Sequence, residues 1–251
     1  MKHFTTFAAI AIGITVLAGS FAQAQLPDPG LEVDRERTAV VITDPQNDFL
    51  SPDGVTWGLV GKSVTANGTV ANIEALMKTA KNEGLPVFVS PHYYFPTDDG
   101  WKFGGAVETM MHAIDMFGRE GALTSEGFEG SGADWLERYK PLINDGHTVV
   151  ASPHKVYGPE SNDLVLQLRK RGIDKIILAG MSANLCVESH LRELLEQGFE
   201  VAVVTDATAA AQAPELDGYA AALTNFRFLA SALWTTEDAT KAMAGAPKAT
   251  D

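Results

Sequence analysis

Short apolar runs alternate with amphipathic segments along most of this chain, and the alternation restricts the folds that the chain can adopt. The apolar runs are about six residues long, which is too short for a helix and typical of strands buried on both faces. In the segments between them, apolar residues recur at spacings of three and four, the period of a helix. The expected strands are 38–43, 85–90, 147–152, 175–180 and 200–205, and the expected helices are 69–82, 163–171, 186–197 and 219–232.

This order of elements predicts an α/β fold in which helices cover both faces of one sheet. Strands joined through helices pair in parallel, because each helix returns the chain to the same end of the sheet. We therefore expect a three-layer α/β/α domain with a mainly parallel sheet of about six strands. A chain of 251 residues with 45% hydrophobic content is sufficient for one such core.

The two ends of the chain differ in composition from the middle. Lys2 and an uncharged apolar run over 7–19 precede Ala22-Gln23-Ala24, the small-x-small pattern of a signal-peptidase site. Cleavage after Ala24 would place the mature protein in the periplasm or outside the cell, the alternative being an uncleaved anchor. The expected divisions are a signal peptide (1–24), an N-terminal arm (25–37), one folded domain (38–235) and a flexible C-terminal tail (236–251).

The chain is acidic, with a formal net charge of −13. A surface of this sign repels nucleic acid and anionic membranes. The first apolar run is shorter than the roughly 20 residues that a membrane span needs, and no second run of that kind follows. We therefore expect a small-molecule substrate, no nucleic-acid partner, and no membrane association once the signal peptide is removed.

Four chemically capable residues follow four of the expected strands. Asp44 ends the first strand, His92 follows the second, Lys155 follows the third and Cys186 follows the fourth. Ligands of open parallel sheets bind beyond the carboxyl ends of the strands. We therefore expect these residues to meet at one edge of the sheet and to form the site.

Cys186, the only cysteine, is the candidate nucleophile. It lies at the expected start of a helix, where free N–H groups and the positive end of the helix dipole favour a thiolate. An exported protein also meets oxidising conditions, under which an unpaired cysteine is a liability unless it is buried or used. The alternative is a small buried cysteine with no chemical role.

A thiol nucleophile needs a partner that takes its proton and later returns one. Asp44 can do both if an apolar environment raises its pKa. The ammonium group of Lys155 would balance the charge. The alternatives are a turn residue before Pro45 and a solvated loop lysine.

Four segments carry a resemblance to the isochorismatase-like cysteine hydrolases, which include nicotinamidases, carbamoyl-sarcosine amidohydrolases, ureidoacrylate hydrolases and isochorismatases. The segments occur in the family's order and span about 38–210. They are TDPQNDF at 43–49, Lys155 after a strand, AGMSANLCV at 179–187 and VVTDA at 203–207.

The resemblance implies a catalytic triad of Asp44, Lys155 and Cys186. It also implies a cis peptide bond between Met181 and Ser182, with the backbone N–H groups of Ser182 and Cys186 forming an oxyanion hole. The implied reaction is hydrolysis of a C–N bond in a small amide through a thioester, and family members are often oligomeric, so we expect a homo-oligomer. The alternatives are hydrolysis of a vinyl ether, or a non-catalytic or redox-responsive binding protein on the same fold.

Two positions depart from the metal-binding members of the family. Nicotinamidases bind a metal through Asp-x-His after the second strand, whereas this chain has His92 at the Asp position and Tyr94 at the His position. We therefore expect neither a metal nor another cofactor. A residual site built from His92 with His112 or His154 remains an alternative.

The connection 91–132 is long, irregular and rich in Gly and aromatic residues, as expected of a lid over a site. A short helix is expected around 107–117. Aromatic and histidine side chains in and near this segment could stack on a planar substrate, although core packing is an equal alternative for each. The candidate substrate-binding residues are Phe49, Trp57, His92, Tyr94 and Trp101.

Overall fold

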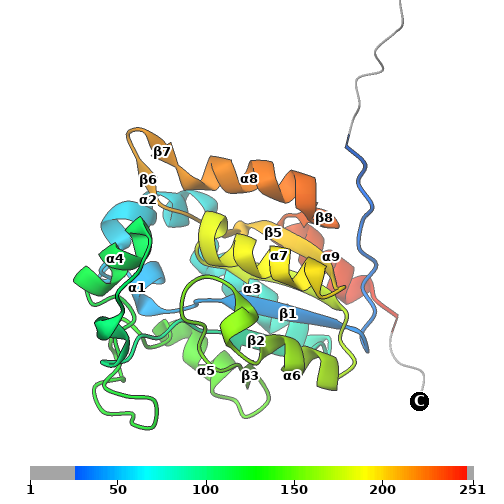
Figure 1. Cartoon of the computed structure of the whole chain (residues 1–251). Helices are drawn as coiled ribbons and strands as arrows, with labels where there is room; N and C mark the ends of the chain where they lie inside the picture. The colour runs from blue at the N-terminus through cyan, green and yellow to red at the C-terminus, as the bar shows by residue number, and fades with distance from the viewer. Residues whose placement is uncertain (1–25, 248–251) are drawn as a thin grey trace, which may run out of the picture.

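A parallel sheet of six strands forms the centre of the computed structural model, which describes residues 26–247 (Figure 1). All five neighbouring pairs in this sheet are parallel. The expected three-layer α/β/α fold is therefore confirmed. In spatial order the strands are β3 (Val149–Val150), β2 (Val87–Ser90), β1 (Thr38–Thr43), β4 (Lys175–Gly180), β5 (Glu200–Thr208) and β8 (Ala232–Trp234).

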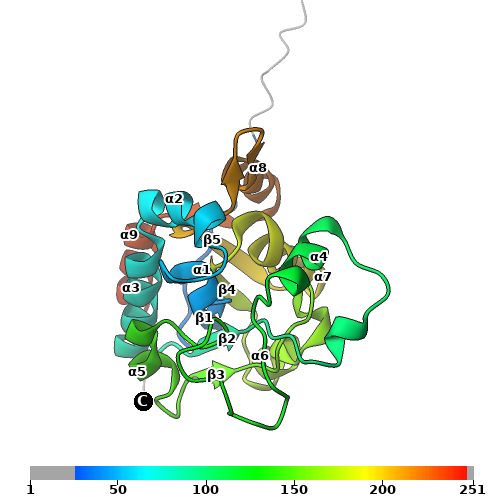
Figure 2. The same cartoon turned by 90° about the vertical axis from the view of Figure 1, so that its left-hand side faces the viewer.

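The helices lie on both faces of this sheet, as the view in Figure 2 shows. The side chains of β1 alternate between the faces: Val40 and Ile42 belong to one core cluster, and Ala39 and Val41 to the other. Because both faces are covered, every residue of β1 is buried. Helices α3 (Thr69–Asn82) and α9 (Thr236–Gly245) cover the first face, and α6 (Leu164–Lys170), α7 (Glu188–Glu196) and α8 (Gly218–Leu229) cover the second.

The strand order places a topological switch point between β1 and β4. From β1 the chain builds outward through β2 to β3, and then returns to add β4 on the other side of β1. At a switch point the connections leave in opposite directions, which opens a crevice at the carboxyl ends of the two strands. Asp44 and Cys186 follow these two strands.

Several smaller elements were not expected or differ in length. Strand β3 has two residues where 147–152 was expected, and helix α2 (Trp57–Asn67) and strand β8 had no counterpart in the predictions. The lid helix α4 is Ala106–Ala113, close to the expected position. The other short elements are α1 (Asn47–Leu50), α5 (Lys140–Ile143) and the antiparallel pair β6 (Gln212–Ala213) and β7 (Leu216–Asp217).

The expectation of a flexible tail from residue 236 is wrong for most of that segment. Helix α9 occupies it, and the side chains of Ala239 and Met243 are fully buried. A capping box starts the helix, because Thr235 and Asp238 each accept a hydrogen bond from the other's backbone N–H group. Asp206 on β5 accepts a further bond from the Thr236 N–H group, which fixes the helix to the sheet.

The structure describes only part of the expected N-terminal segments. Residues 26–34 contain no helix or strand, as expected for an extended arm. The signal peptide expected over 1–24 lies outside the described residues. Within 26–247, no helix combines the length and apolar character that crossing a membrane requires.

Candidate active site

Asp44 is held at the end of β1 by an unusual backbone conformation. Its φ is +46°, a left-handed value that aspartate tolerates better than most residues, and its side chain is completely buried. Beside it, the Thr43 hydroxyl donates a hydrogen bond of 2.9 Å to the Met181 carbonyl group, which joins the ends of β1 and β4. Gly180 permits this contact, since a Cβ atom there would lie 2.1 Å from the Thr43 carbonyl oxygen.

Cys186 lies in a wide turn between β4 and α7. The expected helix from residue 186 begins instead as a π-helical turn, Ala183–Val187, and continues as α7. Turns of this kind are rare and are found frequently at functional sites. The bond between Met181 and Ser182 is cis, as expected. The backbone N–H groups of Ser182 and Cys186 lower the pKa of the thiol, the direction expected of hydrogen-bond donors.

The Cys186 thiol is buried, with 2% of the residue exposed, and its pKa is raised well above the ordinary value. Burial is the largest cause, followed by the charge of Asp44 and a hydrogen bond to it, and the two N–H groups offset only part of the rise. The resting group is therefore a thiol. This corrects the expectation that a helix start would yield a thiolate.

His154, not Lys155, contacts Asp44. The Nε2 atom of His154 lies 2.8 Å from Oδ1 of Asp44, and both side chains are fully buried. Within 26–247, the polar partners of the Lys155 ammonium group are the Asp98 carboxylate and the Tyr93 carbonyl oxygen, so the expected Asp44–Lys155 contact is absent. The chain bends after His154, so His154 reaches Asp44 while Lys155 reaches Tyr93 and Asp98 in the lid.

Four buried residues form a compact cluster at the crevice. Suitable donor atoms of Asp44, His92, His154 and Cys186 all lie within 4.8 Å of one another. The expected meeting of residues from four strand ends thus occurs, with His154 in the place of Lys155. This cluster contains the atoms best suited to hold a metal ion among the described residues.

His92 is the least satisfied member of this cluster. Its ring contacts the rings of Tyr94, Phe117 and His154, at centroid distances of 4.6, 5.2 and 4.7 Å. Neither ring nitrogen makes a hydrogen bond of ordinary geometry within the described chain, although the backbone of Lys155 faces the ring. Burial, followed by the charge of His154, lowers the pKa of His92 well below its usual value, so the ring is neutral.

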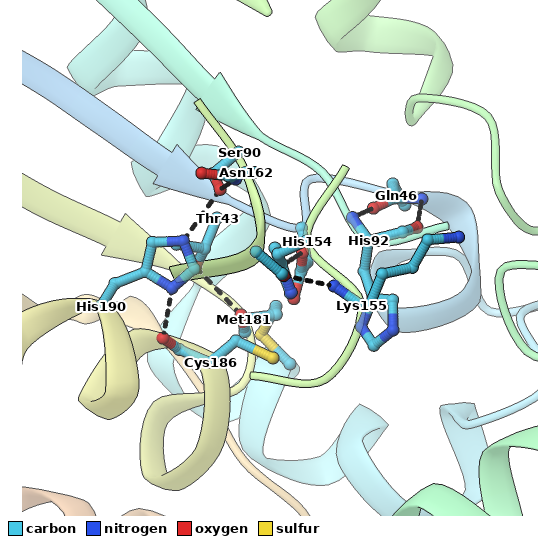
Figure 3. A network of polar contacts seen from close by, with 12 residues as sticks. Thr43, Gln46, Ser90, His92, His154, Lys155, Asn162, Met181, Cys186 and His190 are labelled. Atoms are coloured by element: carbon cyan, nitrogen blue, oxygen red, sulfur yellow. Dashed lines mark hydrogen bonds and ion pairs between the residues drawn. The ribbon is translucent and has the colours of Figure 1, made fainter. Parts of the chain in front are cut away.

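His190 supports the Cys186 turn from the neighbouring helix (Figure 3). Its Nδ1 atom lies 2.7 Å from the Cys186 carbonyl oxygen, so Nδ1 carries the proton, and Nε2 lies 2.8 Å from the Ser90 hydroxyl. The Asn162 side chain donates to that hydroxyl in turn. Burial lowers the pKa of His190 to about 3, which keeps it neutral. The sequence signal for this role was its place one helical turn after Cys186.

The polar residues after Asp44 fasten the lid to the sheet. The Gln46 amide donates to the carbonyl groups of His92 and Ala133 and accepts a bond from the His92 N–H group, as Figure 3 shows for His92. The buried Asp48 carboxylate accepts a bond of 2.7 Å from the Phe117 N–H group. Burial is the main cause that raises the pKa of Asp48. These roles were not predicted from the sequence.

A cavity of about 70 Å³ adjoins Cys186 and is almost entirely apolar. Of the five expected substrate-binding residues, only Phe49 lines it. Trp57 packs against the core, Tyr94 and Trp101 line separate depressions, and His92 lies in the polar cluster. The cavity is lined by Phe49, Thr56, Leu59, Val60, Val107, Met110, Met111, Met116, Tyr157, Ser182, Leu185, Cys186 and Ala211.

This fold agrees with the comparison to known families. The family model for the isochorismatase domain matches residues 38–238. The chain therefore belongs to the isochorismatase family and is a hydrolase of that family.

Similar proteins include several named for amide hydrolysis. The ureidoacrylate amidohydrolase RutB of Pseudomonas syringae pv. syringae (strain B728a) is 30% identical over 191 residues, which cover 72% of this chain and 74% of the relative. RutB of Agrobacterium fabrum is 26% identical, with coverage of 72% and 79%.

Solved structures share the fold at lower identity. A cysteine hydrolase from Pseudomonas syringae pv. phaseolicola 1448A superposes with a TM-score of 0.71 at 21% identity, covering 88% of this chain and 99% of that one. The N-carbamoylsarcosine amidase of Thermoplasma acidophilum gives a TM-score of 0.57 at 21% identity, with coverage of 80% and 97%. At these identities the likeness concerns the fold alone.

Proposed function

We propose that this protein hydrolyses a C–N bond of a small, neutral amide, with Cys186 as the nucleophile. The observation that carries the proposal is that the buried Cys186 sulfur lies within 4.8 Å of a carboxylate oxygen of Asp44, beside a cavity that can receive an acyl group. The names of the relatives, an amidohydrolase and an amidase among them, point to the same reaction class.

The first half of the reaction forms a thioester. Asp44 takes the proton of the Cys186 thiol, and the sulfur attacks the carbonyl carbon of the amide. The N–H groups of Ser182 and Cys186, which lower the pKa of the thiol, stabilise the oxyanion. When the tetrahedral intermediate collapses, the C–N bond breaks and Asp44 returns the proton to the leaving nitrogen, releasing ammonia or an amine.

The second half restores the enzyme. Asp44 takes a proton from a water molecule, whose oxygen attacks the thioester carbonyl group. The C–S bond then breaks, the sulfur regains its proton and a carboxylic acid leaves. His154 acts as a positioning residue, because its bond to Oδ1 fixes the orientation of the Asp44 carboxylate.

The cavity lining favours a substrate with an apolar group. Three methionines and several aliphatic side chains line the cavity, and no charged side chain is among the lining residues. An anionic ureido acid would therefore find no cation there to balance its carboxylate. Methionine side chains adapt to irregular shapes, so small differences in the apolar group are tolerated.

A panel of small amides and ureides, including nicotinamide, tests the proposal through ammonia release measured with a chelator present. The parent is expected to turn over neutral amides with small apolar groups, and Cys186→Ala to lose turnover. The matched control is His147→Gln, a change at an exposed histidine outside the cluster. Turnover that survives Cys186→Ala would refute the thiol mechanism and favour the vinyl-ether reaction. Absence of turnover, with Cys186 responding to peroxide, would favour a redox-responsive binding protein.

A further inference from the structure

The cluster of Asp44, His92, His154 and Cys186 contains more potential ligand atoms than amide hydrolysis requires. One donor atom from each residue can be chosen so that all four lie within 4.8 Å of one another. Each residue follows a different strand, so the sheet as a whole fixes their arrangement. Apart from Cys186, at 2% exposure, these residues are completely buried.

Three members of the cluster have side-chain atoms without a hydrogen-bond partner among residues 26–247. These atoms are Oδ2 of Asp44, Nδ1 of His154 and both ring nitrogens of His92. Buried polar groups are paired in the great majority of cases, and an unpaired one costs stability. Such a concentration of unpaired buried atoms in one place therefore points to a ligand bound among them.

His92 has no role in the proposed amide reaction. The amide reaction needs a nucleophile, a proton carrier and oxyanion donors, and Cys186, Asp44 and two N–H groups supply them. His92 does not line the cavity, and its ring lies between aromatic neighbours with both nitrogens unpaired. An imidazole with a free lone pair that faces a thiol and a carboxylate is a metal ligand by its chemistry.

We propose that these four residues form a closed zinc site, and that zinc binding inhibits the hydrolase. One thiolate, two imidazoles and one carboxylate match the ligands that zinc takes in tetrahedral sites. Ligands at about 2.0–2.3 Å from a common ion are roughly 3.3–3.8 Å apart. The widest separations in the cluster, up to 4.8 Å, must therefore shorten by about 1 Å, and the 2.8 Å contact of His154 with Asp44 must widen by about 0.5 Å.

The binding step exchanges protons for the ion. The Cys186 thiol releases its proton to solvent and forms the sulfur–zinc bond. In the bound state His154 coordinates through Nε2 as a neutral imidazole with its ring proton on Nδ1, so the ion takes the place of the proton between Nε2 and Asp44. The ion then occupies the sulfur lone pair that would attack the substrate. The inhibitory part of this inference rests on the proposed function, whereas the binding part does not.

Cobalt substitution tests the site without relying on activity. The full chain, carrying no histidine tag, is stripped with a chelator, exchanged into buffer with a non-thiol reductant and titrated with Co²⁺. We expect one equivalent to bind in a tetrahedral environment, with a thiolate-to-cobalt charge-transfer absorption that Zn²⁺ removes. His92→Gln should weaken binding at least as much as the roughly 10- to 100-fold that loss of an outer-shell partner costs. The control His147→Gln should bind as the parent does.

Each outcome bears on one part of the inference. Absence of saturable binding, absence of the thiolate absorption, or unchanged affinity in His92→Gln would overturn the zinc site. Turnover that rises when Zn²⁺ is added to the stripped protein would overturn inhibition and indicate an open coordination position. The proposed function fails separately, if the stripped protein shows no amide turnover while it still binds Co²⁺.

Discussion

Replacing His154 and Lys155 in turn decides which of two adjacent residues supports Asp44. In the structure, His154 Nε2 is 2.8 Å from Asp44 in a fully buried pair, whereas Lys155 pairs with Asp98 at a site where the lysine side chain is 23% exposed. Removing one partner of a buried hydrogen-bonded pair leaves the other unsatisfied, which costs about 1–3 kcal/mol. The Lys155–Asp98 pair, with side chains 23% and 11% exposed, does not include Asp44.

These energies set the expected kinetics. At about 1.4 kcal/mol for each factor of ten, a loss of this size in the positioning of Asp44 corresponds to a kcat/KM that is roughly 5- to 150-fold lower for His154→Gln. Lys155 pairs with Asp98 and Tyr93 and not with Asp44, so Lys155→Gln should lower kcat/KM less than His154→Gln does. The assay is ammonia release from the best amide in the panel, with circular dichroism and Tm as controls for folding. A larger loss in Lys155→Gln than in His154→Gln, with both variants folded, would refute the assignment and return the ammonium group to the site.

The structure supports three further predictions, and the sequence a fourth. Because burial raises the pKa of Cys186, alkylation by iodoacetamide should increase only above about pH 8.5, and a midpoint below that value would contradict it. The pKa of His190 is lowered to about 3, so the stability that neutral His190 contributes is present above about pH 6.5 and is lost as the pH falls toward 3. The urea midpoint of His190→Gln should therefore vary less with pH over that range than the midpoint of the parent, and equal variation would contradict this. Gly180→Ala should lower the Tm by several degrees, since its Cβ would overlap the Thr43 carbonyl oxygen; an unchanged Tm would show that the strand ends can separate. Mass spectrometry of protein recovered outside the cytoplasm should give an N-terminus at Gln25, and an intact Met1 would exclude cleavage.

Elements with a strong period were predictable from the sequence. The expected bounds 69–82 and 175–180 agree with α3 and β4, because their apolar spacing is unbroken and their ends carry clear signals. Strand β8 has three residues, too few for any alternation to be recognised. Helix α9 was missed because its Ala- and Gly-rich sequence hides its buried stripe, although the capping box at Thr235 and Asp238 was a usable signal.

The candidate site was predictable in its location but not in its details. Topology alone brings residues that follow parallel strands to one edge, so Asp44 and Cys186 could be placed together. The choice between His154 and Lys155 depends on which of two neighbouring side chains faces inward, and β3 is too short to fix that phase from a pattern. The cavity lining depends on how the lid lies, and the lid lacks a regular period.

The four residues of the cluster come from four separate stretches of chain, and this has a consequence for biogenesis. Until β1, β2, β3 and β4 are aligned, Cys186 is a solvent-exposed thiol that does not yet lie beside Asp44. Reactivity at that sulfur therefore reports completion of the tertiary structure. A newly made chain trapped before this stage would be recognised by an alkylating label that the finished enzyme resists at neutral pH.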